Sequence, residues 1–147
     1  MPAPQKSALE GLCKSAVKNA GLEGEDAPKL GEAMADFFAQ ALAMFAQMTQ
    51  VLPGIPAAVD PISGSGATAG PGMMLPPPAG GPGASQLEGL ASTALRSAGL
   101  EGEDMPQLAK VLAQSAEIGL TLLCAQALVS PGIAIAGFVT TAPGRLM

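Results

Sequence analysis

Few side chains in this 147-residue sequence are of the types that perform chemistry. The sequence has no histidine and two cysteines, Cys13 and Cys124. Without histidine neither a Ser-His nor a Cys-His nucleophile pair can form, and two thiols are too few for an all-cysteine zinc site. Because the two cysteines lie far apart in the sequence, we expect two buried thiols in a reducing compartment, with one disulfide as the alternative.

The acidic side chains, the next candidates for chemistry, gather in two turns. Residues 23–26 and 101–104 both read Glu-Gly-Glu-Asp. This spacing differs from that of an EF-hand calcium loop, and carboxylates just before a helix stabilise its positive end. The glycines of residues 64–72 lack the lysine that follows a phosphate-binding loop. We therefore expect no catalytic site, no metal and no cofactor, and we do not expect an enzyme.

The elements that hold these residues follow from an internal repeat. When the sequence is shifted by 78 positions, 20 of the 47 residues from Leu9 to Ile55 are identical to their counterparts. Beyond Ile55 the second copy is about six residues shorter, and Thr68 then matches Thr140. We expect two tandem units, residues 1–75 and 85–147, joined by a Pro/Gly linker at residues 76–84 that its prolines hold extended.

Each unit is predicted to contain two helices. Apolar residues recur at helical spacing over residues 8–20 and 27–50, and again over residues 86–98 and 105–129. A serine followed three residues later by glutamate predicts a capping box, and an aspartate before a proline predicts an N-cap. The expected caps are Ser7, Glu10, Asp26, Ser85, Glu88 and Asp104.

The predicted fold is therefore mainly α, with four main helices in two tandem helix-helix-extended-loop units. An irregular segment that begins with Pro-Gly follows each pair of helices. The stretches 55–59 and 133–139 are candidates for short strands, and the Gly, Ser and Thr residues of 63–72 are expected to turn the chain back.

The second helix of each unit is apolar on more than one face. A short first helix cannot cover it, so its remaining surface must meet the other unit, another subunit or lipid. The composition agrees, since 48% of the residues are apolar and 13% are charged. The expected interaction-surface residues are Phe37, Phe38, Met44, Phe45, Met48, Ile118, Leu122, Leu123, Ile133, Ile135 and Phe138.

Charge narrows the class of partner. The net charge of −5 comes from 12 acidic and 7 basic residues, and the basic residues are scattered. Binding to nucleic acid requires clustered lysine and arginine, so we expect no direct nucleic-acid partner. Residues 1–6 lack a basic region followed by an apolar core, so no secretory signal peptide is expected.

Two uncharged runs make a membrane protein the main rival interpretation. Residues 37–59 and 118–142 contain no charge, and each run exceeds the roughly 20 residues that span a bilayer. Glutamines interrupt the first run, however, and a Pro-Gly pair breaks each one. The sequence also lacks the tryptophan and tyrosine that mark membrane interfaces. We therefore favour helices that are buried in a protein assembly.

The resulting hypothesis is a non-enzymatic structural subunit of a larger symmetric assembly. It is expected to be a homo-oligomer that contacts neighbouring protein subunits, in the cytoplasm or in a virion-like particle. Three copies in a ring would place six similar units around one axis, which suggests a phage-tail-like or baseplate-like component of an injection machine. The alternatives are a membrane-associated oligomeric helical protein and a small helical protein-binding module.

Overall fold

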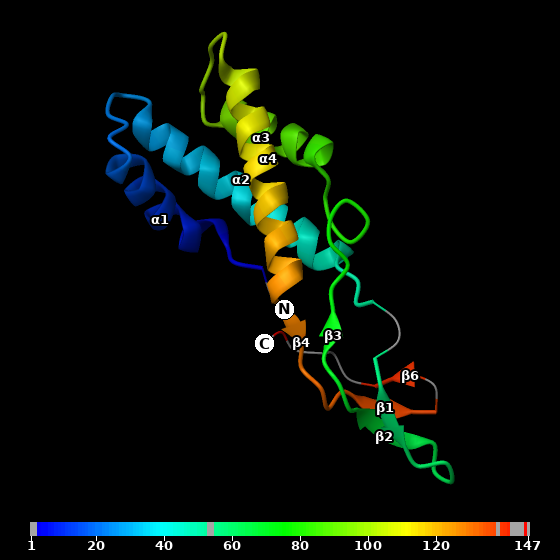
Figure 1. Cartoon of the computed structure of the whole chain (residues 1–147). Coiled ribbons are helices and arrows are strands. Elements are labelled where there is room, and N and C mark those ends of the chain that lie inside the picture. Colours follow the sequence, from blue (N-terminus) through cyan, green and yellow to red (C-terminus); the bar gives the residue numbers. More distant parts are fainter. Residues whose placement is uncertain (1–2, 53–54, 138, 142–145, 147) are drawn as a thin grey trace.

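The computed structural model describes residues 3–52, 55–137, 139–141 and 146. These residues form a mainly α structure with four helices and several short antiparallel strands, as the sequence predicts. Figure 1 shows the helices gathered at one end of the molecule and the strands at the other, with the described parts of both chain ends near the junction.

Helices α1 (Lys6–Asn19) and α2 (Ala27–Met48) form the first helical hairpin. A Schellman motif ends α1: the Gly21 amide donates to the Lys18 carbonyl at 3.0 Å and the Leu22 amide to the Val17 carbonyl at 3.2 Å. Gly21 has a φ of 73°, which glycine adopts without strain. The chain thus reverses within a few residues, and α2 packs along α1.

Helices α3 (Ala84–Ser97) and α4 (Met105–Gln126) form the second hairpin. The same motif ends α3, because the Gly99 amide donates to the Arg96 carbonyl at 2.9 Å and the Leu100 amide to the Leu95 carbonyl at 3.1 Å. Gly99 has a φ of 74°. Every bound of α3 and α4 lies 78 residues after the matching bound of α1 or α2.

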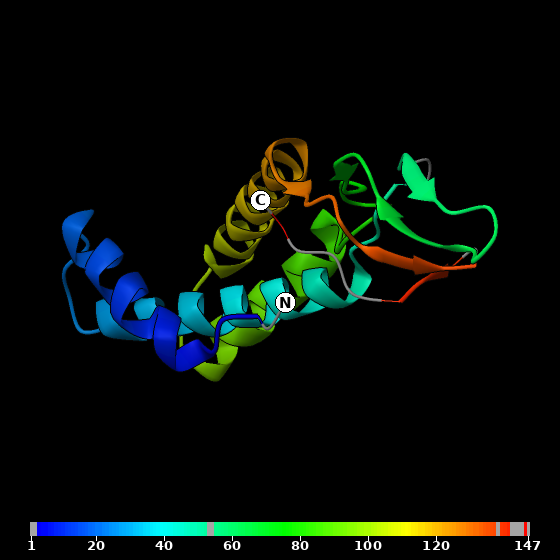
Figure 2. The same ribbon diagram turned by 90° about the horizontal axis from the view of Figure 1, so that it is seen from below.

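The two hairpins meet where α2 packs against α3, and the main core lies there. Small alanines let the helices approach closely, while larger side chains fill the space between them. Figure 2 shows α2 in contact with both its own hairpin partner and the second hairpin. The buried members of this core are Ala33, Phe37, Ala41, Leu87, Ala91, Ala94, Leu95, Ala109, Leu112, Ala113 and Ala116.

The strands form two small antiparallel sheets. Strands β1 (Ala57–Val59), β2 (Ser65–Thr68), β5 (Ala134–Ala136) and β6 (Val139–Thr140) lie in the order β1-β2-β5-β6. Strands β3 (Gly72–Met73) and β4 (Leu128–Val129) pair with each other. The expected strands at 55–59 and 133–139 thus contain β1, β5 and the start of β6, whereas the turn expected at 63–72 contains β2 and the first residue of β3.

The helix caps differ from the predicted capping boxes. Helix α1 begins at Lys6 with Gln5 as its N-cap, so Ser7 lies inside the first turn and Glu10 pairs with Lys14 instead. Helix α3 begins at Ala84 with Gly83 as its N-cap, which likewise leaves Ser85 inside the helix and Glu88 exposed. In each helix the N-cap lies two residues before the predicted serine, so both predicted capping boxes were wrong.

Two other side chains accept backbone amides at the start of α3. The Gly83 amide donates to Gln86 Oε1 at 3.3 Å, and the Ala84 amide donates to Glu117 Oε1 at 3.1 Å. Asp26 and Asp104 do occupy the N-cap positions of α2 and α4. Within the described residues neither carboxylate accepts a cap hydrogen bond, and Asp26 instead accepts one from Lys29 Nζ at 2.7 Å.

The expected extended linker is a compact turn. The Gly80 amide donates to the Pro76 carbonyl at 3.0 Å, and Pro82 is fully buried. A side chain at Gly81 would stand 2.9 Å from the Phe45 ring, so this segment packs against the end of α2. The prediction failed because the glycines allow a close approach to the core that the prolines alone would not favour.

Candidate interaction surface

Large apolar side chains remain exposed on three parts of the molecule. Four of them lie on helix α4, six lie in or next to the strand segments, and Leu12 and Leu22 lie on and just after α1. Scattered exposed leucines are ordinary, but a row of them on one helix marks a contact surface. The exposed large apolar residues are Leu12, Leu22, Val51, Leu52, Val59, Ile62, Met73, Val111, Ile118, Leu122, Leu123 and Val139.

The predicted surface residues divide into three groups. Ile118, Leu122 and Leu123 are exposed on α4. Phe37 and Phe45 are buried in the cores, so their assignment to the surface was wrong: the second hairpin covers the face of α2 that the first leaves open. Phe38, Met44, Met48, Ile133 and Ile135 are half-buried. Phe138 lies outside the described residues.

One face of α2 is covered, whereas the matching face of α4 is open. In both helices the residues of this face recur every four positions. Ala33, Phe37, Ala41 and Phe45 are all buried on α2. Their counterparts 78 residues later, Val111, Ser115, Gly119 and Leu123, are all exposed on α4. Val111 is 57% exposed against 2% for Ala33, and Leu123 is 40% exposed against 6% for Phe45. We call these four residues of α4 the α4 row.

A similar contrast separates the short helices. Leu90 and Ala94 on α3 and its C-cap residue Ala98 are buried or half-buried. Their counterparts, Leu12 and Ala16 on α1 and its C-cap residue Ala20, are all exposed, and Leu12 is 69% exposed. These residues share one helix face because each is four positions from the next. We call Leu12, Ala16 and Ala20 the α1 row.

Two matching threonines in the strands also differ in burial. Thr68 of β2 is the buried polar residue of the described core, and its backbone amide donates to the Ile133 carbonyl at 3.0 Å. In return the Ile133 amide donates to Thr68 Oγ1 at 3.0 Å. The counterpart Thr140 on β6 is exposed at the outer edge of the sheet, and β1 forms the opposite outer edge.

An apolar groove borders the α4 row. It lies between α1, α2 and α4, has a volume of about 390 Å³, and is lined by Leu9, Phe38, Ala41, Leu42, Ala116, Gly119, Leu120 and Leu123. Gly119 and Leu123 therefore belong to both the groove and the row. The lining has no polar side chain that would orient a reacting molecule, so it suits contact with another apolar surface.

The two acidic turns lie side by side around a second hollow of about 380 Å³. Carboxylates of both turns line it, including Glu23, Asp26, Glu101, Glu103 and Asp104. Within the described residues no group of three or more His, Cys, Asp or Glu side chains is arranged to hold a metal ion. The two turns join the helices of each hairpin.

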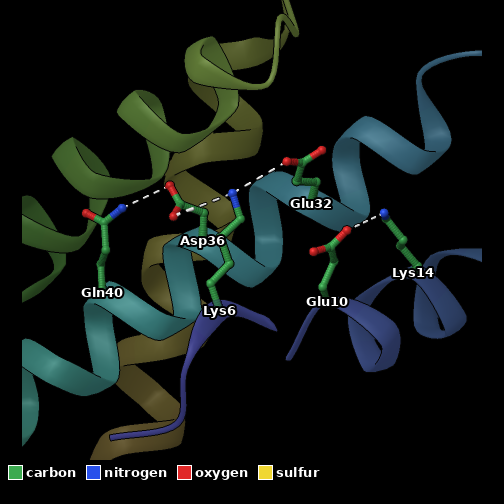
Figure 3. Close-up of polar contacts among 6 residues, drawn as sticks. All are labelled: Lys6, Glu10, Lys14, Glu32, Asp36 and Gln40. Carbon is green, nitrogen blue, oxygen red and sulfur yellow. Dashed lines mark hydrogen bonds and ion pairs between the residues drawn. The ribbon is translucent and has the colours of Figure 1, made fainter. Parts of the chain in front are cut away.

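Ion pairs tie the start of α1 to α2 (Figure 3). Lys6 Nζ lies 3.5 Å from Glu32 Oε1 and 3.9 Å from Asp36 Oδ1, and Gln40 Nε2 donates to Asp36 Oδ2 at 2.9 Å. The hydrogen bond from Lys14 lowers the pKa of the Glu10 carboxyl. Because these groups are exposed to water, the pairs orient the two helices more than they stabilise them.

Both cysteines are buried and free in the part of the chain that the structure describes. Burial raises the pKa of the Cys13 thiol and of the Cys124 thiol, because it disfavours the thiolate. The expected pair of buried thiols is therefore present, and the alternative disulfide is not formed between them. A raised pKa also opposes a role for either thiol as a nucleophile.

Comparison with known proteins supplies no further guide to this surface. No protein family model, curated protein sequence or solved structure matches the chain.

Proposed function

We propose that this protein is a structural subunit that consists of two like halves and assembles with further copies of itself into a symmetric particle. The helices support the two halves, since all four pairs of matching bounds are offset by 78 residues. The α2 and α4 starts also match: the Ala27 and Met105 amides donate to the Gly24 and Gly102 carbonyls, both at 3.3 Å.

The strand register gives independent support. Ala57 pairs with Thr68 in the first half, and their counterparts Ile135 and Thr140 pair in the second. The isolated bridge between Val51 and Met74 likewise has a counterpart between Val129 and Leu146. In each case the second partner is displaced by 72 residues, as the shorter second copy of the sequence requires. Matching hydrogen-bonded pairs are harder to produce by chance than matching helices.

The exposed apolar surface of α4 is the observation that carries the proposed assembly. Val111, Ile118, Leu122 and Leu123 are each 40% to 60% exposed on this one helix. Transferring such side chains out of water is favourable by about 1.5–3 kcal/mol for each complete burial. A partner that covers α4 therefore gains a large part of its binding energy from these residues.

Lipid is the rival cover for the same surface. Within the described residues, α4 is the one helix that is long and apolar enough to cross a membrane, and 28% of its most apolar window is buried. The uncharged run of residues 118–142, however, is helical only as far as Gln126 and then enters β4 and β5. The part of α4 before this run carries two charged residues, Lys110 and Glu117. We therefore favour protein over lipid.

Three copies of a chain with two like halves would place six similar units around one axis. Such a part joins a threefold component to a sixfold one. Phage tails and related injection machines contain these symmetry mismatches, and a tail-like or baseplate-like component remains our candidate assembly by this analogy.

The experiment that tests the assembly is a mass measurement of the full chain in buffer without detergent. Light scattering after size-exclusion chromatography should give a multiple of the 14.5 kDa chain mass, and electron microscopy should show particles of one size. A stable monomer at all accessible concentrations would contradict the proposal. Recovery only in detergent would contradict it too and would favour the membrane-associated alternative.

A further inference from the structure

Each surface that meets at the junction between the two halves has a matching surface in the other half, and this matching surface is uncovered in the single chain. We infer that a second copy of this protein docks head to tail, with its α1 on the α4 of the first copy and its β1 along the β6 of the first. This inference rests on the two like halves of the proposed function. It names the contact surfaces and the direction of assembly, which the proposed function leaves open.

The helix surfaces that meet at the internal junction have matching surfaces that the single chain leaves uncovered. Inside one chain, α2 of the first half packs on α3 of the second. The helix that matches α2 is α4, and the helix that matches α3 is α1, so an identical junction would pack α4 on the α1 of a second copy. The residues that this contact would bury are those of the α1 row together with Val111, Ser115 and Gly119 of the α4 row, whose counterparts lie in the core shared with α3. All of them are exposed in the single chain.

The shapes of these rows suit a close helix contact. The α4 row has Ser115 and Gly119 at its centre, and the α1 row has Ala16 at its centre. Small residues at the centre let two helix backbones approach, while Val111 and Leu12 supply apolar area at the ends. Where α2 carries Phe37 the α4 row carries serine, so the second junction needs less space between its helices.

The strands lead to the same second copy independently. Inside one chain β2 of the first half pairs with β5 of the second, with Ala67 opposite Ala134. The matching strands are β6 and β1, which are the two outer edges of the sheet. Exposed edge strands with unpaired backbone groups are templates for another strand. Neither edge is protected by charge, since β1 reads Ala-Ala-Val and β6 reads Val-Thr.

The register of the intermolecular pair follows from the internal one. Val139 would lie opposite Pro56 of the second copy, as Ala67 lies opposite Ala134. Thr140 would take the place of Thr68 and exchange hydrogen bonds with Ile55 of the second copy, as Thr68 does with Ile133. The Pro56 carbonyl already accepts the Ala69 amide at 2.7 Å, so this residue faces inward and its missing amide removes no donor from the outer edge.

Both contacts run in one direction along the chain of copies. The second half of one copy offers α4 and β6, and the first half of the next copy offers α1 and β1. A contact between two different surfaces is heterologous, and it yields a ring when its rotation closes. A twofold dimer would instead pair a surface with itself. The direction of the contact is therefore the feature to test.

The test uses two variants of the full chain that each remove one surface. Gly119→Arg places a charged side chain in the α4 row, and Ala16→Arg places one in the α1 row. Both positions are exposed in the single chain, so both variants are expected to fold, with circular dichroism as the check. Ala125→Arg is the matched control, because Ala125 and its counterpart Gln47 are both exposed and lie outside either row.

The head-to-tail contact predicts a specific result in native mass spectrometry. Each arginine variant alone should be monomeric. Every contact between two identical copies would include the altered row and would bury an unpaired guanidinium. An equimolar mixture should give a dimer with one copy of each variant, because one retains the α1 row and the other the α4 row. The Ala125→Arg control should assemble like the unmodified chain.

Other results would overturn the inference in different ways. If the unmodified chain is monomeric, both the inference and the proposed function fail. If the unmodified chain assembles but either arginine variant still does so alone, or if the mixture stays monomeric, the surfaces named here are wrong while the proposed assembly stands.

A second measurement probes the strand edge without relying on loss of assembly. A mixture of the Pro56→Cys and Val139→Cys variants should form a disulfide-linked dimer much faster than either variant alone. The native thiols are buried and do not compete. Equal rates in the mixture and in the separate samples would overturn the proposed register.

Discussion

The two helical hairpins have matching bounds and opposite outer faces. The α1/α2 hairpin is covered along α2 by the second hairpin, whereas the α3/α4 hairpin leaves the corresponding side of α4 exposed. The short helices reverse the pattern, because α3 is covered and α1 is open. Helices with matching bounds therefore differ in which face is buried, and the difference depends on whether the helix belongs to the first or the second hairpin.

The hairpins also differ in what fixes the start of the short helix. Lys6 ties α1 to Glu32 and Asp36 of α2 (Figure 3), whereas the Glu117 carboxylate of α4 accepts the first amide of α3. The counterparts of Glu32 and Asp36 are Lys110 and Gln114, which could not bind a lysine in the same way. Two like hairpins have thus kept their geometry with different polar contacts.

The largest expected effect contrasts matching positions on the two long helices. Phe37→Ala should lower the free energy of unfolding by about 3–5 kcal/mol, because Phe37 is fully buried between the hairpins. Ser115→Ala at the counterpart position should change it by less than about 0.5 kcal/mol, because Ser115 is exposed. Urea unfolding of the two variants measures the difference, and equal costs would remove the contrast between the faces.

A second substitution tests how closely each hairpin is packed. A Cβ at Gly31 would stand 2.8 Å from Lys14 Cγ and 2.9 Å from its Cα, while the counterpart position is already Ala109. Gly31→Ala should therefore destabilise the chain by about 1–3 kcal/mol, since α1 must shift away from α2. Thermal unfolding tests this; a stabilised Gly31→Ala variant would mean that the hairpins are equally spaced.

A third pair of substitutions should behave alike in the two hairpins. A Cβ at Gly11 in α1 or at Gly89 in α3 would meet nothing within 4 Å. Each glycine-to-alanine change should raise the free energy of unfolding by about 0.5–1 kcal/mol, because alanine loses less backbone entropy in a helix. The two variants serve as controls for one another in chemical denaturation, and a loss of stability in only one would show an unrecognised contact there.

The smallest effect concerns the turn between β1 and β2. Hydrogen bonds from the Ile62 amide and the Ser63 hydroxyl lower the pKa of the Asp60 carboxyl. A lowered folded-state pKa contributes stability above the ordinary aspartate pKa of about 3.9, and this contribution is lost as the pH falls through the folded value. Asp60→Asn should flatten that acid part of the stability curve. An unchanged curve would show that these hydrogen bonds do not persist.

The positions of the four helices could be predicted because each depends on local signals. Helical spacing and the glycines at 21 and 99 place the ends of the short helices within two residues. The long helices were predicted two or three residues too long, because the Gln50 carbonyl accepts the Leu75 amide and Leu128 and Val129 form strand β4. Pairing between distant segments ended these helices, and that pairing has no local signal.

The candidate surface was only partly predictable for a related reason. Helical periodicity shows that α2 and α4 are apolar on several sides, but it does not show which helix the chain covers. Phe37 was therefore assigned to the surface, and Leu12, Val59, Ile62 and Val139 were missed. Aligning the two halves would have suggested Leu12, because its counterpart Leu90 borders the core. The compact turn of the linker could not be predicted, because its glycines pack against the end of α2, and the sequence does not show this contact.

The turn of residues 60–64 distinguishes the two halves on the outside of the molecule. This turn lies at the tip of the sheet end in Figure 1 and contains Ile62, which is 95% exposed, whereas β6 begins at Val139, soon after β5 ends at Ala136. In a closed ring of such chains, this projection would recur once per polypeptide and thus at every second pseudo-equivalent place. A neighbouring component that binds this turn would recognise whole polypeptides and not single helical hairpins.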